Sequence, residues 1–396
     1  MNIVYYTQNL RDLFWVKPIW EQTGGTFCSE LVETGRLFAE HDPTVPFRQI
    51  KAHDKLTLGR AAGGSGLTIK RKTIRLRLAQ VAREMKPDVI VTTSNHRHAI
   101  RRDLSGWLRQ GFTTFPRVKQ VQAFHGVSSK NVKFNPWMVE YDLLLLPGRR
   151  ERDKFASMGV LDHVRHEMIG HPKSDRVLRG ELTRSVARAH FGLPDLPTVL
   201  YAPTHGALSS FYKWGLAICQ AVPEECNLIV KPHPSLLITV GAEGVGGEML
   251  GAVTNFLRQR GGVPGGTAEP KRAGTVWLPH DPDVVLSMAA ADVLVTDYSS
   301  VAEEFLVFDR PLVFADHLAS ATGRDQAQRD KGDWEGIFSS GTVVTEPGML
   351  REAITRNLQC PETHGDIRRT LREYIFENLD GHCAERAAAA IRQIAS

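Results

Sequence analysis

The chain has 396 residues, of which 42% are hydrophobic and 23% charged, with a net charge of +5. This length favours two domains of ordinary globular composition. The five cysteines are scattered without a CxxC pair, which argues against a disulfide framework or a zinc site. The chain opens on apolar residues without the basic region of a signal peptide, and no apolar run approaches the ~18 residues of a membrane span. We therefore expect a cytoplasmic protein.

Short β-rich runs alternate with helical stretches along the chain. The expected strands in the first half are Ile3–Tyr6, Val45–Ile50, Val89–Thr93, Val118–Phe124 and Leu143–Leu146. Those in the second half are Val199–Ala202, Leu228–Lys231, Val276–Leu278, Val293–Thr296, Leu312–Phe314 and Val343–Val344. Several are continuous apolar runs, which is typical of parallel strands covered on both faces. The pattern predicts an α/β protein with two doubly wound parallel sheets.

The boundary between the two predicted domains falls near 175–190. There the polar helical segment Ser174–His190 is followed by the helix-breaking sequence Gly192-Leu193-Pro194. We expect an N-terminal domain over 1–178, a C-terminal domain over 179–380 and a final helix over 381–396. Other expected helices are Gly25–His41, Leu67–Lys86, Leu250–Arg260, Ser300–Asp309, Pro347–Gln359 and Cys383–Ile394.

Positive charge is concentrated between positions 50 and 120, a segment with sixteen Lys and Arg residues and only four acidic residues. Such a region attracts anions, although a solvated surface would explain it as well. Leu67–Lys86 has the composition of an amphipathic basic helix, which suits an anionic membrane surface at the inner face of the membrane. No RRM or zinc-finger motif is present, so nucleic acid is not the expected partner.

Polar turns follow the expected strands at the edge where open α/β sheets bind ligands. His125 and Gly126 follow Val118–Phe124, and a histidine there can take a proton from a hydroxyl, or can simply close a turn. Lys231 ends the expected strand Leu228–Lys231 of the second domain, and His233 follows it with a proline on each side. They offer cationic and donor groups to a phosphate, or form a stiff loop with incidental polar groups.

Two further turns carry hydroxyl groups. Pro203-Thr204-His205-Gly206 follows Val199–Ala202, and Asp297-Tyr298-Ser299-Ser300 follows Val293–Thr296. One of the two serines is expected to cap the next helix, and a helix N-terminus with two hydroxyls is also a phosphate cradle. The chain has no GxGxxG after its first strand, no GxxxxGK[ST] and no GxSxG, which argues against dinucleotide oxidoreductases, P-loop NTPases and α/β hydrolases. His96 and His98 have metal-ligand spacing but no acidic or cysteine neighbour, so no metal site is expected.

Together, in this order, the turns resemble the CDP-glycerol glycerophosphotransferase family, which includes teichoic-acid primases and polymerases and relatives that build capsular polymers. The resemblance covers roughly 85–390 and is carried by Gln122–Gly126, Gly170–Asp175, Tyr201–Thr204, Lys231–Pro234 and Ala291–Ser300. The chain departs from the family pattern in several places. The stretch Val301–Glu304 stands where the family is often rich in aromatic residues, and the acidic donor-polyol segment of the family does not align between Asp316 and Gly341. Glu304 stands where an aspartate is common, and His205 begins a pair that is usually bulkier, aromatic and basic.

The resemblance implies a GT-B architecture, in which two Rossmann-like domains face a cleft and the last helix crosses back to the first domain. It implies a CDP-glycerol or CDP-ribitol donor and an acceptor hydroxyl on a lipid-linked or growing polymer, without a cofactor or metal. It assigns His125 as the general base on the acceptor and His233 to the donor pyrophosphate. The remaining donor-binding positions are Lys231, Pro203, Thr204, Thr296, Ser299, Ser300 and Glu304.

Two other functions remain compatible with the residues. The first is a glycosyltransferase or UDP-sugar epimerase of the same architecture, which would bind UDP in the same phosphate cradle. The second is an inactive member that only binds an anionic polymer. Preference for CDP or UDP separates the two enzyme classes, and the absence of turnover would identify the inactive member.

Overall fold

The computed structural model describes most of the chain, in segments separated by gaps. The described residues are 1–7, 10–29, 32–50, 55–57, 68–70, 81–82, 84–93, 118–124, 126–127, 134–236, 246–260, 273–279, 281, 283–320 and 332–396. They divide into two compact units, each built from more than one segment. Unit 1 comprises Met1–His125, Val132–Lys173 and His382–Ser396, and unit 2 comprises Gly126–Asn131 and Ser174–Gly381.

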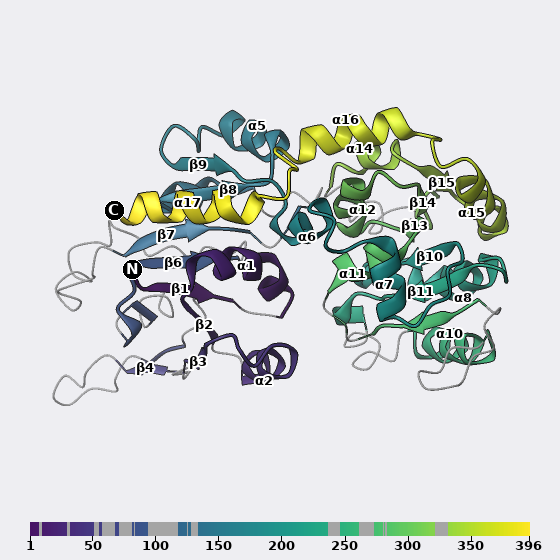
Figure 1. The fold of residues 1–396 in the computed structure, drawn as a ribbon, viewed down its shortest axis with the longest axis horizontal. Coiled ribbons are helices and arrows are strands. Elements are labelled where there is room, and N and C mark those ends of the chain that lie inside the picture. Colours follow the sequence, from purple (N-terminus) through teal and green to yellow (C-terminus); the bar gives the residue numbers. More distant parts are fainter. Residues whose placement is uncertain are drawn as a thin grey trace. The chain divides into compact units, whose positions relative to one another are not determined.

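Unit 1 is built on a sheet whose seven described strands are all parallel (Figure 1). In chain order they are β1 (Ile3–Tyr6), β2 (Thr26–Ser29), β3 (Phe47–Gln49), β6 (Val89–Thr92), β7 (Lys119–Gln122), β8 (Leu143–Leu146) and β9 (Arg165–Met168). Their order across the sheet is β3-β2-β1-β6-β7-β8-β9. The flanking helices are α1 (Leu10–Thr23), α2 (Val32–His41), η2 (Pro136–Glu140) and α5 (Arg149–Ser157).

The C-terminal helix α17 (Cys383–Ala395) belongs to unit 1 although almost all of unit 2 precedes it in the chain. It packs beside α1 against β7 and β8 (Figure 1). Ala387 and Ile391 are fully buried in the same core cluster as Tyr5 and Leu143. A row of small and aliphatic side chains at helical spacing therefore closes one face of the first sheet.

Unit 2 is built on a second sheet, whose six described strands are also parallel. They are β10 (Thr198–Tyr201), β11 (Asn227–Val230), β12 (Thr275–Trp277), β13 (Val293–Thr296), β14 (Leu312–Ala315) and β15 (Thr342–Val344), in the order β12-β11-β10-β13-β14-β15. Alternate residues of one strand enter different cores, since Leu200 and Val199 belong to clusters on opposite faces. Both faces are covered, which explains the continuous apolar runs in the sequence.

Two groups of helices cover the second sheet. The cluster containing Leu200 includes residues of α7 (Arg184–His190), α11 (Val284–Ala290), α12 (Val301–Phe305), η5 (Leu306–Phe308), α14 (Trp334–Phe338) and α16 (Gly365–Ile375). The cluster containing Val199 includes residues of α8 (Phe211–Ala221), α10 (Gly247–Arg260) and α15 (Leu350–Gln359). Short helices at the connections are η3 (Pro172–Ser174), α6 (Asp175–Leu178), η4 (Gly206–Leu208) and η6 (Pro347–Met349).

The structure confirms the two doubly wound parallel sheets and corrects two predicted helices. Gly25–His41 begins with strand β2, and a helix forms only from Val32, because residues 26–29 pair between β1 and β3. Within Leu67–Lys86, Thr68–Lys70 forms strand β5, which pairs antiparallel with β4 (Lys55–Thr57). Pairing with a segment distant in sequence overrides a local helical pattern in both places. Apart from 68–70, 81–82 and 84–86, that predicted helix lies outside the described residues.

Most of the basic region 50–120 also lies outside the described residues, including His96 and His98. None of the helices in the described segments has the length and apolar character needed to cross a bilayer.

Candidate functional site

The polar turns of unit 2 lie at one edge of its sheet. Tyr201, the last residue of β10, is in register with Val230 of β11 and Val295 of β13. The pairing continues beyond the strands. The N–H of Lys231 donates to the carbonyl of Tyr201 at 2.9 Å, and the N–H of Ala202 donates to the carbonyl of Val295 at 3.0 Å. The turns that follow β10, β11 and β13 therefore start side by side, at the carboxyl edge where α/β sheets bind ligands.

Asp297 joins two of these turns from a fully buried position. Its carboxylate accepts the backbone N–H of Thr204 at 2.9 Å, and the N–H and hydroxyl of Ser210 at 2.7 and 2.8 Å. Burial and the nearby Asp297 charge raise the pKa of Tyr201, whose hydroxyl pairs with that of Ser210 at 2.9 Å. Sequence reasoning quoted Asp297 only as part of a motif and gave no role to Ser210, which lies nine residues beyond the end of β10.

Three of the predicted donor-binding residues are buried at the start of these turns: Thr296, Pro203 and Thr204. The Thr296 hydroxyl donates to the carbonyl of Ala202 at 2.7 Å, which joins β13 to β10. The Pro203 carbonyl accepts the N–H of His233 at 3.2 Å, which joins the turns after β10 and β11. These hydrogen bonds connect the three neighbouring turns.

Lys231 and His233 follow β11 with different exposure. Lys231 is 6% exposed, and its ammonium group donates to the carbonyl of Asp281. His233 is half-buried, and its Nδ1 accepts the N–H of Ser235 at 3.1 Å. A ring nitrogen that accepts a hydrogen bond carries no proton, so neutral His233 carries its proton on Nε2. Nε2 is therefore the nitrogen of the neutral His233 ring that can donate a hydrogen bond.

Ser299 and Ser300 precede the short helix α12. Ser300 is the N-cap residue, as expected for one of the two serines, but its hydroxyl makes no capping hydrogen bond. Ser299 is 4% exposed, and its hydroxyl accepts the N–H of Val301 at 3.4 Å. Because α12 has only five residues, its helix dipole is small. This turn can therefore bind an anion mainly through its hydroxyl groups.

Glu304 lies against the segment that follows His125. His125 itself lies outside the described residues, whereas Gly126 and Val127 are described and belong to unit 2. Gly126 has a φ of +128°, and a Cβ placed on it would lie 3.1 Å from Oε1 of Glu304. Val127 is buried in the core cluster that contains Phe305. The buried Glu304 carboxylate therefore approaches the backbone directly after the predicted general base.

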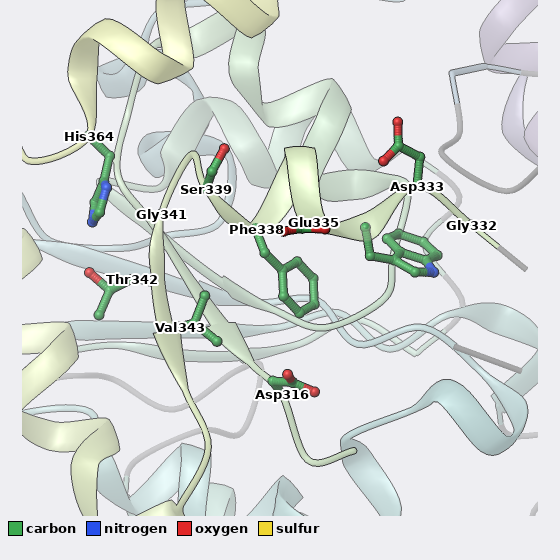
Figure 2. Close-up of a pocket in the computed structure, with 11 residues that line it drawn as sticks. Asp316, Gly332, Asp333, Glu335, Phe338, Ser339, Gly341, Thr342, Val343 and His364 are labelled. Carbon is green, nitrogen blue, oxygen red and sulfur yellow. The ribbon is translucent and has the colours of Figure 1, made fainter. Parts of the chain in front are cut away.

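A pocket of about 900 Å³ lies beside the carboxyl end of β14 (Figure 2). Its lining includes the carboxylates of Asp316, Asp333 and Glu335, the hydroxyls of Ser339 and Thr342, the side chains of Trp334, Phe338 and Val343, and His364. Partial burial lowers the pKa of His364, and the charges of Arg368 and Arg356 add to this effect. The titratable side chains of the lining are thus three acids and an imidazole held toward its neutral form.

Asp316 connects this pocket to the serine turn, because its carboxylate accepts a hydrogen bond from the buried hydroxyl of Tyr298. Asp316 was missed in the sequence, although it follows a strand as the other site residues do. The signal that found them, a polar residue directly after an apolar run, would have found Asp316 too. In the described part of the chain, His, Cys, Asp and Glu form no group of three or more that could hold a metal.

Comparisons with known proteins show what this chain is similar to. Residues 266–393 match the family model described as CDP-Glycerol:Poly(glycerophosphate) glycerophosphotransferase. The structure of the wall teichoic acid polymerase TagF matches with a TM-score of 0.60 at 16% identity, over 100% of this chain and 89% of that chain. UDP-GlcNAc 2-epimerase from Neisseria meningitidis matches with a TM-score of 0.55 at 13% identity, over 99% and 100%. The S. aureus MnaA–UDP co-structure gives 0.54 at 16% identity, over 99% and 96%. The curated protein sequences gave no significant match.

The structural likenesses establish a GT-B-like fold with two parallel-sheet α/β domains. The family match covers β13 and the turn after it, including Ser299, Ser300 and Glu304, and continues into α17. The same turns carried the resemblance seen in the sequence. The part of the chain over 266–393 is thus similar to the CDP-glycerol:poly(glycerophosphate) glycerophosphotransferase family.

Proposed function

We propose that this chain transfers glycerol phosphate or ribitol phosphate from a CDP-activated donor to a hydroxyl on a lipid-linked or growing cell-surface polymer. The observation that supports this most is the joining of the turns after β10, β11 and β13 at one sheet edge. The turn after β11 carries Lys231 and His233, and the turn after β13 carries Ser299 and Ser300. Asp297 connects the turn after β13 to the turn after β10. A donor soak of the TagF structure with CDPG makes this the first nucleotide to test.

The donor diphosphate is the ligand whose chemistry suits these turns. His233 offers Nε2–H, Lys231 offers an ammonium group, and Ser299 and Ser300 offer hydroxyls. Donors fixed before the reaction stabilise developing negative charge without reorganisation. We assign Pro203, Thr204 and Thr296 to shaping the donor site, because they are buried and their hydrogen bonds join neighbouring turns.

In the proposed step, the acceptor hydroxyl attacks the β-phosphorus of the donor in line with the bond to CMP. A new oxygen–phosphorus bond forms, the bond to the CMP oxygen breaks, and CMP leaves with that electron pair. His125 accepts the proton from the acceptor hydroxyl, a role that typically contributes about 10²–10⁴-fold. We assign Glu304 to the support of this residue, because its carboxylate lies beside Gly126.

The pocket beside β14 suits the polyol part of a substrate better than its phosphates. Carboxylates such as Asp316, Asp333 and Glu335 accept hydrogen bonds from hydroxyls and repel phosphate. The hydroxyls of Ser339 and Thr342 can accept and donate. Glycerol and ribitol are both rich in hydroxyls, so this pocket is the proposed place where the transferred group is distinguished.

The test combines nucleotide binding with transfer. A thermal-shift panel of CMP, CDP, UMP, UDP, CDP-glycerol and CDP-ribitol identifies the donor, since a ligand at 100 times its Kd stabilises a protein by about 2.7 kcal/mol. Release of CMP with polymer extension then reports turnover. His233→Ala should lower turnover by about 10²-fold or more, as loss of a fixed charge-stabilising donor does. The exposed His190 provides a matched control in His190→Ala, which should leave turnover unchanged.

A UDP-dependent glycosyltransferase or epimerase is the second candidate. It is supported by the likeness to the N. meningitidis epimerase bound to UDP-GlcNAc and to the S. aureus MnaA–UDP co-structure. Stabilisation by UDP but not by CDP would favour this candidate. Binding of polymer without any turnover would instead identify an inactive member of the family.

Membrane association is a separate proposal. The basic region 50–120 carries the charge that anionic lipid headgroups attract. The protein should sediment with vesicles that contain anionic lipid and remain in solution with purely zwitterionic vesicles. Equal behaviour with both vesicle types would count against the contact.

A further inference from the structure

The imidazole rings of His205 and His233 contact each other in a tilted arrangement at the carboxyl edge of the second sheet. Their ring centroids lie 4.2 Å apart, with an angle of 33° between the ring planes. His205 belongs to the turn after β10 and is exposed, whereas His233 belongs to the turn after β11 and is half-buried. The same two turns are joined by the hydrogen bond from the His233 N–H to the Pro203 carbonyl.

Two contacts therefore restrain the His233 imidazole from different directions. The Ser235 N–H binds Nδ1 within the plane of the ring, at 3.1 Å. The His205 ring covers one of its faces. An imidazole held only at one nitrogen can still rotate away from that bond, whereas a ring packed against one face has fewer accessible rotations. Gly206, with a φ of +69°, turns the chain directly after His205.

We propose that His205 is a positioning residue, which holds the His233 ring so that Nε2–H is the nitrogen presented to the donor diphosphate. The role requires a flat ring at position 205 and does not require an ionisable one. The benefit for binding arises because the His233 donor is oriented before the ligand arrives, so less conformational freedom is lost on binding. The proposal rests on the proposed function for the identity of the ligand, although the ring pair itself does not.

The first experiment reads the pair without any substrate. Nitrogen-15 labelling of histidine in the full-length protein reports which imidazole nitrogen carries the proton, and His233→Gln identifies the His233 signals. We expect wild-type His233 to be protonated on Nε2, and His205→Phe to preserve this form. His205→Ala should produce a mixture of both tautomers, because the ring can rotate and release the Ser235 bond.

The second experiment measures the affinity for CDP and for CDP-glycerol by calorimetry. His205→Ala should weaken binding by about three- to tenfold, the range that one aromatic pair provides. His205→Phe should restore binding to within about twofold of wild type, and the exposed-surface control His190→Ala should match wild type. Thermal unfolding of each variant confirms that differences in binding come from folded protein.

Three results would overturn the proposal. His205→Ala could leave both the His233 tautomer and the affinity unchanged. His205→Phe could bind as weakly as His205→Ala, in which case an N–H of His205 itself contacts the ligand. The tautomer could also be Nδ1–H in wild type. If wild-type protein binds neither CDP nor CDP-glycerol, the proposed function fails, while the labelling experiment still decides the role of His205.

Discussion

The carboxylate of Asp297 accepts the backbone N–H of Thr204 at 2.9 Å, so one side chain after β13 fixes the turn after β10. Its second oxygen accepts two hydrogen bonds from Ser210, directly before α8. A buried carboxylate is tolerated only where its oxygens find hydrogen-bond donors, and three donors from Thr204 and Ser210 meet this need. Asp297 therefore fixes the turns that we propose to bind the nucleotide substrate, without having to contact that substrate itself.

Replacing Asp297 by Asn tests this role. The amide keeps one acceptor oxygen but turns an NH₂ group toward donors of Thr204 or Ser210. Loss of a hydrogen bond to a buried charged group costs about 1.5–3 kcal/mol, so the free energy of unfolding should fall by that amount in urea titrations. The KM for the donor should rise as well. Asp162→Asn is the matched control, because Asp162 lies exposed on the surface, and it should change neither quantity.

The contact between Gly126 and Glu304 leads to a second prediction. Gly126→Ala places a methyl group on a backbone with φ +128° and 3.1 Å from the Glu304 carboxylate. Residues in such backbone regions cost about 1–3 kcal/mol, and relief of that strain would displace the segment after His125. Turnover should fall at least about tenfold, as one misplaced catalytic group can cost ~10².

Gly180→Ala separates backbone strain from the contact with Glu304. Gly180 has a φ of +75°, but a Cβ there meets nothing within 4 Å. Its substitution should lower the melting temperature and leave turnover intact. In the Glu304→Asp background, which shortens the carboxylate side chain, Gly126→Ala should lose less activity than in wild type. Equal losses in both backgrounds would contradict the steric argument.

The sheets of this protein could be predicted from sequence because their strands are buried on both faces. Runs such as Leu143–Leu146 and Val293–Thr296 were placed with their observed bounds. Strand β2 was wrongly predicted as part of a helix over Gly25–His41, because only the pairing of Thr26–Ser29 with β1 and β3 makes this segment a strand. Strand β9 was missed as well, since Arg165–Met168 is polar and lies at the sheet edge.

The candidate site was predictable as a set of turns but not as a network. Lys231, His233 and Ser299 follow apolar runs, so each could be named from its position. The hydrogen bonds of Asp297 with Thr204 and Ser210 join residues about 90 positions apart, so the local sequence pattern does not predict them. The roles of the named residues stay predictions, which the proposed experiments test.

The pocket beside β14 leads to a third prediction, about recognition of the transferred group. Glu335→Gln and Asp333→Asn remove charge from exposed lining residues. If these carboxylates bind polyol hydroxyls, the affinity for CDP-glycerol should fall by about tenfold or more, because a hydrogen bond to a charged group contributes about 1.5–3 kcal/mol, while the affinity for CDP stays constant. Glu352→Gln on the exposed surface of α15 is the control. Parallel losses for CDP and CDP-glycerol would place the nucleotide, not the polyol, in this pocket.

The pH dependence of stability provides a fourth prediction, centred on His171. His171 is fully buried and packs edge-on against Trp15, with ring centroids 5.1 Å apart. Burial lowers its pKa well below the ordinary value, and the charge of Lys173 lowers it further. In the unfolded chain, His171 therefore binds a proton as the pH falls through about 6.5, whereas in the folded protein it stays neutral at this pH.

The sign of the effect follows from this difference. Above about pH 6.5, His171 is neutral in both states and contributes no pH dependence. As the pH falls below that value, the unfolded state gains a proton and the free energy of unfolding decreases, by at most ~1.4 kcal/mol per pH unit. His171→Gln and His171→Phe should both reduce this slope between about pH 6.5 and 5 in urea titrations followed by tryptophan fluorescence. Because burial also lowers the pKa of His317 and His364, part of the slope should remain in both variants. Slopes identical to wild type in both variants would mean that His171 takes up its proton in the folded state, which would require an opening of the core around Trp15.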